Sequence, residues 1–206
     1  ARAIYQGEVF DGVNSALANS CSSTCLKSKL REAYWEYVTD SFSIREGKQI
    51  ISWGKSDGVN PTDYFSARDF SYLNPDDEVR RLAGTAIVMN ITPKSGTSPW
   101  TFTFVTQFVF PQGKAQVPPD QLPATVNLAD ATVTPLSFDN TEYGLKTIYA
   151  GSTWDMSLSI FRGFNHQPEW MESSRSLVGS VVFLNVQPVY RHVSALGMDF
   201  SKSWSK

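Results

Sequence analysis

The sequence lacks any long apolar segment and any excess of basic charge. Its longest apolar runs, such as Val181 to Leu184, fall far short of the roughly 20 residues that a helix needs to cross a bilayer. Eighteen Lys and Arg residues stand against twenty Asp and Glu residues, which gives a net charge of −2 without a basic block. The sequence therefore predicts no transmembrane helix, and it argues against a nucleic-acid binder, whose electrostatic footprint is basic.

Charge of either sign is scarce, whereas aromatic residues are abundant. Charged residues make up 18% of the 206 residues, and aromatic residues make up 13%, with six Trp and thirteen Phe. Typical soluble domains have about 25% charged residues. A single β-rich domain with an extensive apolar face would have this composition. Both a transmembrane β-barrel and a soluble β-sandwich satisfy that description.

Cysteine is nearly absent. Cys21 and Cys25 are the only two, and they lie in a Ser/Thr-rich stretch. Their spacing predicts a short-range disulfide, which would form in an oxidising compartment. The chain begins at Ala1 without an initiator Met or a signal peptide, so we expect a processed or truncated N-terminus and export.

Alternation of apolar and polar residues is the commonest strong pattern, and it predicts about eight β-strands. Most of them span roughly nine to twelve residues, close to the length that a tilted strand needs to cross a membrane. The expected turns are short at 40–41, 93–98 and 151–152 but long at 54–81, 111–140 and 165–176, a pattern typical of outer-membrane barrels. The expected strands are 3–13, 29–39, 42–53, 82–91, 100–110, 143–149, 153–161 and 193–202.

The predicted strands have one strongly apolar face. Strict alternation from 100 to 110 places five aromatic residues together, and alternation from 153 to 161 does the same for four apolar residues. A β-sandwich lectin would also show this pattern, with the apolar face as its core and long loops that bind sugar. Trp and Tyr at the strand ends favour the barrel, because aromatic girdles lie at membrane interfaces. The first set is Trp100, Phe102, Phe104, Phe108 and Phe110, the second is Trp154, Met156, Leu158 and Ile160, and the strand-end residues are Trp100, Tyr143, Tyr149 and Trp154.

Several short motifs resemble one family of outer-membrane proteins. They are, in chain order, Leu30–Tyr34, Ile44–Gln49, Trp53–Gly58 with Asn60, Pro61 and Asp63, Asp155–Gly163, and Pro188–Tyr190 followed by Leu196–Ser201. These segments are similar to the Gram-negative porin-like family known as domain of unknown function 1302, which is distantly similar to alginate-export barrels. The resemblance runs from residue 30 to the end, and it implies an antiparallel transmembrane β-barrel.

The chain departs from that family in two ways. Glu46 stands where an aliphatic residue facing lipid is expected, which points to a rim position, a protein-covered position or another register. Family members are also typically longer, and the chain ends at Ser203–Lys206 without the terminal aromatic residue of most outer-membrane barrels. The resemblance therefore implies that residues 1–206 are a single β-barrel domain within a larger barrel. A small eight-stranded barrel filled by side chains is the alternative.

No catalytic motif is present. The sequence has no Gly-x-Ser-x-Gly, no His-Glu-x-x-His and no phosphate-binding loop. The two histidines, His166 and His192, are expected to be ordinary loop or rim residues. We therefore expect neither an enzyme nor a cofactor or metal site.

The most polar segment is the expected loop 54–81. Folded into a barrel lumen, its charges of both signs would narrow the pore and set its solute preference. A solvated loop held by Arg–carboxylate pairs is equally consistent with the sequence, and the acidic run Asp76–Glu78 suggests calcium as a further alternative. Together with the polar faces of the strands, the segment supplies the pore-lining candidates Glu32, Glu36, Arg45, Gln49, Asp63, Arg68, Asp69, Arg80, Arg81, Glu142, Lys146 and Asp155.

The sequence thus predicts a porin-like channel or transport conduit in the outer membrane of a Gram-negative bacterium. Its expected partners are outer-membrane lipid and a small or amphipathic solute, with a homo-oligomer or an envelope complex as further possibilities. Two other functions stay open. One is a secreted β-sandwich that binds carbohydrate, and the other is a structural barrel subunit of an envelope assembly.

Overall fold

A computed structural model describes residues 2–11, 28–53, 62–70, 77–93, 98–113, 122–129 and 138–202, with the backbone alone for 2–11, 28–30 and 78. The described chain is all-β apart from a one-turn helix, α1 (Asp77–Arg80), and a 3-10 turn, η3 (Phe138–Asn140). No helix among these residues is long and apolar enough to cross a membrane. The disulfide expected between Cys21 and Cys25 lies outside the described residues.

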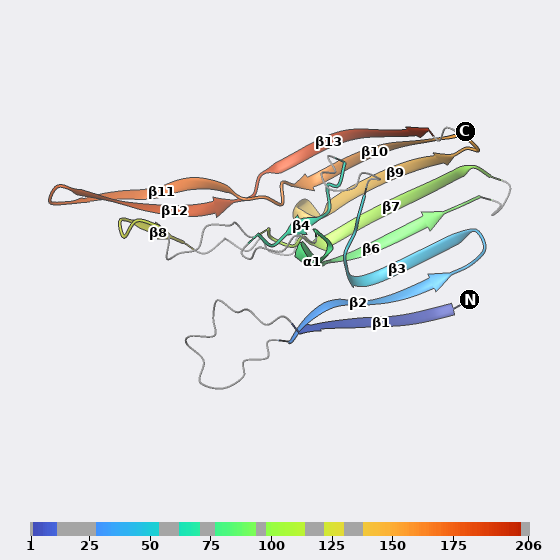
Figure 1. The fold of residues 1–206 in the computed structure, drawn as a ribbon, viewed down its shortest axis with the longest axis horizontal. Coiled ribbons are helices and arrows are strands. Elements are labelled where there is room, and N and C mark those ends of the chain that lie inside the picture. Colours follow the sequence, from blue (N-terminus) through green and yellow to red (C-terminus); the bar gives the residue numbers. More distant parts are fainter. Residues whose placement is uncertain are drawn as a thin grey trace.

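One large antiparallel sheet dominates the molecule (Figure 1). Every neighbouring pair of its strands is antiparallel, and most neighbours are also consecutive in the sequence. Each of the eight ranges expected to form strands contributes one strand to it. In spatial order the strands are β1 (Arg2–Asp11), β2 (Ser28–Val38), β3 (Phe42–Gln49), β6 (Gly84–Ile91), β7 (Trp100–Val109), β9 (Glu142–Ala150), β10 (Trp154–Phe164) and β13 (His192–Lys202).

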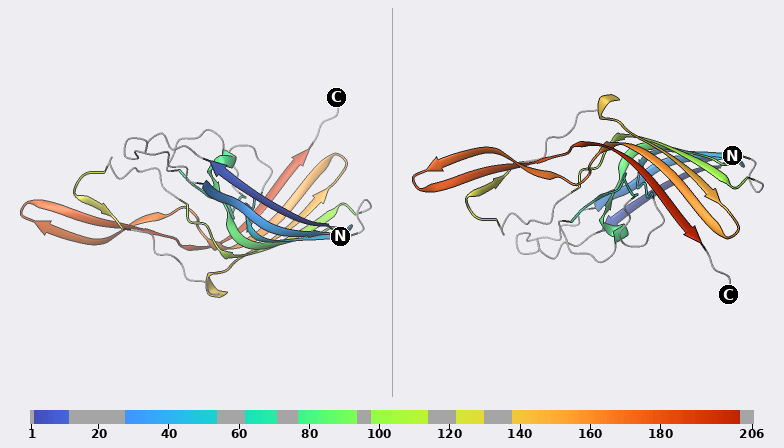
Figure 2. Two further views of the ribbon diagram at one scale, coloured as in Figure 1. Left: turned by 90° about the horizontal axis from the view of Figure 1, so that it is seen from below. Right: turned by 90° about the horizontal axis from the view of Figure 1, so that it is seen from above.

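The sheet is curved but not closed. It forms a trough, and β1 and β13 are its two edges (Figure 2). A closed barrel is therefore not found, in contrast to the expectation from the sequence. The estimate of about eight strands is also too low for the chain, because five further strands lie outside this sheet: β4 (Ala67–Arg68), β5 (Arg81–Leu82), β8 (Val126–Leu128), β11 (Glu169–Val178) and β12 (Val181–Val189).

The connections differ at the two ends of the trough. Short turns join β2 to β3, β6 to β7 and β9 to β10, and the N and C labels lie at the same end (Figure 1). Long connections occupy the other end, where the β11–β12 hairpin projects beyond the sheet. The expected long loop 165–176 is wrong in part, since β11 begins at Glu169. A register shift between Glu172 and Ser174 breaks the alternation of β11, so its sequence does not read as a strand.

The two faces of the large sheet have opposite polarity. On β10, Leu158 and Ile160 face outward from the trough and are 47% and 56% exposed, whereas Ser157 and Ser159 face inward and are only 2% exposed. A water-soluble sheet normally buries its apolar face. Here the polar face of the strand is the buried one.

A bulge in β7 interrupts the alternation that was predicted for residues 100–110. Thr85 pairs with Val109 and Ala86 with Gln107, which leaves Phe108 as an extra residue on β7. Beyond the bulge, each residue lies on the face opposite to the one that strict alternation predicts. Val109 is therefore exposed, whereas Phe110 is buried. Five aromatic residues from 100 to 110 therefore do not share one face.

The buried core lies on the concave side of the trough. There the inserted segment (residues 62–70 and 77–82), which includes α1, folds over the strands (Figure 2). Phe65 is 1% exposed and contacts Trp53 and Phe161 edge to face, at ring-centroid distances of 4.9 Å. Gly144 on β9 leaves room for this packing, because a Cβ there would lie 2.6 Å from the Phe65 ring.

Candidate functional site in the trough

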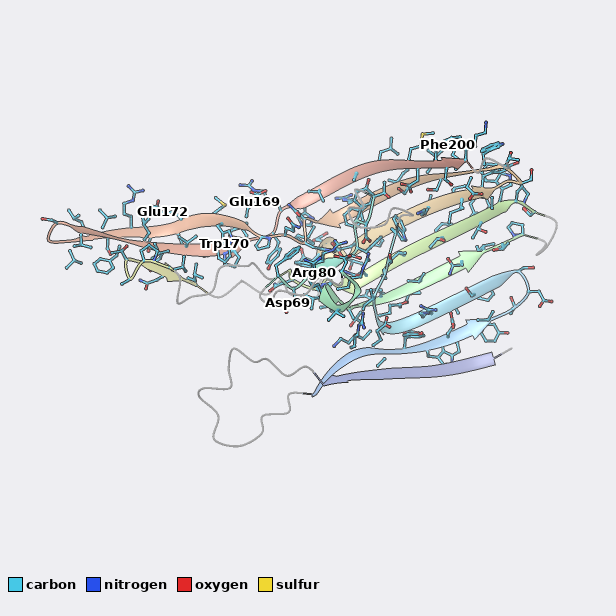
Figure 3. The ribbon with its side chains drawn as sticks, viewed as in Figure 1. Asp69, Arg80, Glu169, Trp170, Glu172 and Phe200 are labelled. Carbon is cyan, nitrogen blue, oxygen red and sulfur yellow. The ribbon has the colours of Figure 1, made fainter. Side chains whose placement is uncertain are left out.

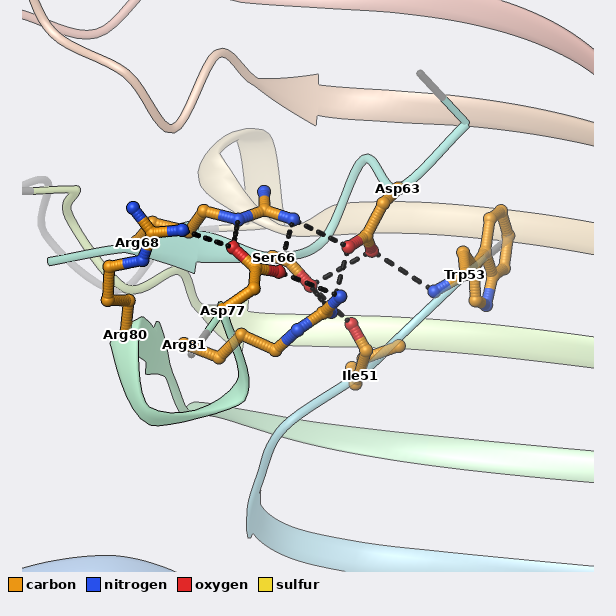
Figure 4. Close-up of polar contacts among 8 residues, drawn as sticks. All are labelled: Ile51, Trp53, Asp63, Ser66, Arg68, Asp77, Arg80 and Arg81. Atoms are coloured by element: carbon orange, nitrogen blue, oxygen red, sulfur yellow. Dashed lines mark hydrogen bonds and ion pairs between the residues drawn. The ribbon is translucent and has the colours of Figure 1, made fainter. Parts of the chain in front are cut away.

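The inserted segment is organised around the carboxylate of Asp63. Its Oδ1 accepts hydrogen bonds from the Trp53 backbone N–H at 3.1 Å and from the Ser66 hydroxyl at 2.9 Å (Figure 4). Its Oδ2 pairs with Arg81 at 2.8 Å and with Arg68 at 3.4 Å. The Asp63 side chain is fully buried, so these donors supply what water would otherwise supply.

A second carboxylate, Asp77, gathers three guanidinium groups. Arg68 binds it through two parallel hydrogen bonds of 2.7 and 3.0 Å, and Arg80 and Arg81 each approach to 3.3 Å (Figure 4). The hydrogen bond from Arg68 holds the pKa of Asp77 below its ordinary value, although partial burial opposes this effect. The bidentate geometry is the strong form of this interaction.

Aromatic stacking and a polar cluster join the inserted segment to the sheet. Tyr64 stacks on Phe161 of β10 at 5.3 Å, and the Thr62 hydroxyl donates to Asp199 of β13 at 2.9 Å. Burial, with a smaller contribution from Asp199, raises the pKa of the Tyr64 hydroxyl. Asp199 also lies 3.7 Å from the Lys146 ammonium group, so its charge has a partner on the sheet itself.

A buried carboxylate–imidazole pair lies near the end of the trough with long connections. Glu142, the first residue of β9, is 0% exposed and accepts hydrogen bonds from Gln107 at 2.8 Å and from the Phe164 backbone N–H at 2.7 Å. His166 Nε2 lies 2.9 and 3.0 Å from its two oxygens, and the His166 ring stacks on Phe110 at 5.6 Å. His166 lies in the loop between β10 and β11, as expected, but it is buried and bonded to Glu142, so the expectation that it is an ordinary loop residue is wrong.

The charged candidates on β2 and β3 also face the trough. Arg45 binds Glu36 at 3.0 Å, and its guanidinium group lies 4.4 Å from the centre of the Tyr34 ring. Glu32 accepts a hydrogen bond from the Ile50 backbone N–H at 2.7 Å. Gln49 is buried and donates to the Ala86 carbonyl at 2.9 Å.

Uncharged side chains line another part of the concave face, and none of them was among the predicted pore-lining residues. Thr103 donates to Asn90 at 2.8 Å, and Asn90 donates to Ser43 at 3.3 Å. Thr92 and Thr101 are also joined, at 3.3 Å. These contacts cross β3, β6 and β7, so no motif in one segment of the sequence could reveal them.

All twelve pore-lining candidates lie on the sheet's concave face or in the inserted segment over it. Asp155 occupies an inward position at the start of β10, and Asp69 is buried in the inserted segment, where its N–H donates to the Arg80 carbonyl at 2.8 Å. Of the acidic run considered for calcium, Asp76 and the side chain of Glu78 lie outside what the structure describes, and Asp77 is paired with arginines. No cluster of three His, Cys, Asp or Glu in the described ranges is suited to a metal ion.

The convex face carries an aromatic belt at the end with short turns. Trp100, Tyr149, Trp154 and Phe200 form a continuous row across β7, β9, β10 and β13, with ring centroids 4.6–6.4 Å apart. Phe200 lies near the end of β13, as Figure 3 shows. Beside this row, towards the long connections, the exposed residues are Phe104, Leu145, Leu158, Ile160, Leu196 and Met198.

Comparisons with known proteins add no assignment: no family model, curated protein or solved structure matches the chain. The resemblance to the porin-like family stays a prediction from the sequence.

Proposed function

We propose that the chain forms part of the wall of an outer-membrane β-barrel, and that this barrel is a passive channel or conduit for a small or amphipathic solute. The observation that supports this proposal most strongly is that the large sheet exposes its apolar face and buries its polar face, the opposite of a water-soluble sheet. Its convex face exposes aliphatic side chains bordered by an aromatic belt, whereas its concave face holds buried polar and charged groups. Transmembrane barrels have this arrangement because lipid surrounds them and water or polar groups fill them.

The inserted segment is the proposed constriction of this channel. Its three arginines form ion pairs with Asp63 and Asp77 over the concave face, and Phe65 and Tyr64 anchor it there. Fixed charges of both signs beside a passage favour small polar or zwitterionic solutes over apolar ones. The uncharged row of Ser43, Asn90 and Thr103 provides a hydrogen-bonding wall for the same path.

A carbohydrate-binding β-sandwich fits the geometry less well. A sandwich would need a second sheet packed on the apolar face of the first. Among the described residues, β11, β12 and β8 form the other long sheet, and they project beyond the end of the trough (Figure 1). The convex side chains stay exposed instead.

The experiment is fractionation of the full-length protein expressed in a Gram-negative host, followed by gel electrophoresis with and without heating. We expect it to partition with outer membranes, to need detergent for extraction and to run as a compact band unless heated. Purified protein in liposomes should then admit small solutes in a swelling assay with solutes of graded size.

Three outcomes separate the alternatives. A soluble, compact monomer without detergent would refute the membrane barrel. A heat-modifiable membrane protein that admits no solute, and that co-purifies with other envelope proteins, would favour a structural subunit over a channel. Swelling limited to small solutes would support the proposed conduit.

A further inference from the structure

Arg162 is an outward charge near the end of β10 that leads to the long connections. It shares the convex face with Leu158 and Ile160, and its side chain is exposed. In the ladder it pairs with Tyr143 of β9 and with Ser194 of β13, which are exposed as well. Among the residues that the structure describes, Arg162 has no side-chain hydrogen bond or ion pair.

The carboxylates of the neighbouring strands do not reach Arg162. Glu46 also points outward, because its neighbour Arg45 points into the trough, but it lies on β3. Four strand spacings, or about 19 Å, separate β3 from β10. The acidic residues of β9, β10 and β13 all face the trough, and they are Glu142, Asp155 and Asp199. This part of the convex face is therefore positively charged.

Arg162 lies at the border of the apolar belt. The outward row of β10 begins at Trp154 in the aromatic belt, continues through three apolar residues and ends at Arg162. These nine residues match the length of about 9–11 that a tilted strand needs to cross a bilayer. Tyr143 beside Arg162 is of a type enriched at membrane interfaces. In the proposed barrel, Arg162 thus lies at the level of the lipid headgroups.

We infer that Arg162, with Tyr143 and Ser194, binds the phosphate group of an anionic membrane lipid. This inference rests on the proposed membrane barrel. A guanidinium group presents N–H donors in a geometry that matches phosphate oxygens, and the two hydroxyl groups can donate as well. The acyl chains of the same lipid would cover Ile160 and Leu196, which are 56% and 78% exposed. A lipid therefore matches both the charge and the apolar surface, whereas a free phosphate ion matches the charge alone.

Native mass spectrometry of the full-length protein tests this site. The protein is extracted from outer membranes in neutral detergent and mixed with equal amounts of dioleoyl phosphatidylglycerol and dioleoyl phosphatidylcholine. We expect the wild type to retain the anionic lipid preferentially, and Arg162→Gln to lower that retention about fivefold. The matched control is Arg175→Gln, which removes an exposed arginine from the projecting hairpin and should change nothing.

Two further measurements separate charge from shape, and lipid from free anion. Arg162→Lys keeps the positive charge and should retain more phosphatidylglycerol than Arg162→Gln does. A large excess of inorganic phosphate should not displace the lipid, because the ion lacks acyl chains. Heat-modifiability on a gel shows that each variant is folded.

The outcomes separate the lipid site from the barrel itself. Equal retention by the wild type and Arg162→Gln, equal losses in the Gln and Lys variants, or an equal loss in Arg175→Gln overturns the lipid site and leaves the barrel standing. Displacement by inorganic phosphate overturns the lipid as the ligand. Absence of the wild-type protein from outer membranes refutes the proposed function, and the lipid site with it. A loss confined to Arg162→Gln supports both.

Discussion

The concave and convex faces of the large sheet belong to the same strands but differ in the side chains that they bury and expose. On the concave face, the carboxylates of Asp63 and Asp77 are both paired with arginines. On the convex face, large apolar side chains are exposed and touch mainly one another. Truncating an apolar side chain should therefore matter most inside the trough, and adding a charge should matter most outside it.

The largest effect is expected from Phe65→Ala on the concave side. The substitution leaves a cavity among Trp53, Phe161 and Gly144, and Phe→Ala changes in cores cost about 3–5 kcal/mol. We expect the inserted segment to detach from the sheet, which would speed both tryptic cleavage after Arg80 or Arg81 and solute entry into liposomes. The control Phe200→Ala, on the exposed convex face, should leave both rates unchanged. Equal rates in the two variants would contradict a docked constriction.

Leu158→Arg tests the convex side. Arg near the middle of a lipid-facing strand destabilises outer-membrane barrels by about 2–4 kcal/mol. We expect a smaller fraction of heat-modifiable protein in outer membranes and a lower folding free energy in bilayers. Leu158→Met preserves volume and should behave like the wild type. A soluble protein would tolerate the exposed arginine, so an unchanged fraction would speak against lipid contact.

Asp77 should make the inserted segment sensitive to acid. Because Arg68 lowers the pKa of Asp77 in the folded state, its stabilisation is complete above the ordinary pKa of about 4 and is lost as the pH falls through the lowered value. Acrylamide quenching of tryptophan fluorescence, including that of Trp53, should rise in this range. Asp77→Asn should cost on the order of 2 kcal/mol at neutral pH and flatten the acid response. Asp40→Asn, at an exposed turn, is the matched control.

The smallest effect on stability is expected from Arg45→Gln. Its pair with Glu36 is partly exposed, and such pairs contribute about 0–1 kcal/mol. The substitution leaves the Glu36 charge unbalanced in the trough, so cation selectivity in planar bilayers should increase. Arg175→Gln removes a similar pair from the projecting hairpin and should not change selectivity. An equal shift in both variants would place the selectivity determinant elsewhere.

The strands of the large sheet could be predicted from the sequence because alternation is a local signal. Trp154 to Ile160 lie as the pattern indicates, and the inward and outward residues of β10 follow it. The bulge at Phe108 could not be predicted from the sequence of β7 alone, because it arises from the way in which β7 pairs with its partner strand β6. The β11–β12 hairpin was missed for the same reason, since its register shift hides the alternation.

The site was predictable to the extent that its residues lie together in the sequence. Asp63, Arg68, Asp77 and Arg81 fall within one charged stretch, so their concentration was visible although their pairing was not. The partnership of His166 with Glu142 joins two strands and leaves no sequence signal. Glu46 stood out in the sequence as an exception, and its outward position agrees with that observation.

The edges of the trough constrain what can complete a cylinder around it. Seven consecutive antiparallel pairings separate β1 from β13, and seven is odd, so the two edge strands run in opposite directions. Antiparallel closure therefore requires that β1 and β13 pair directly or that an even number of strands stands between them. An odd number would force one parallel pair into the ring. The total strand count of an all-antiparallel cylinder containing this sheet is thus even, whichever polypeptide supplies the remaining strands.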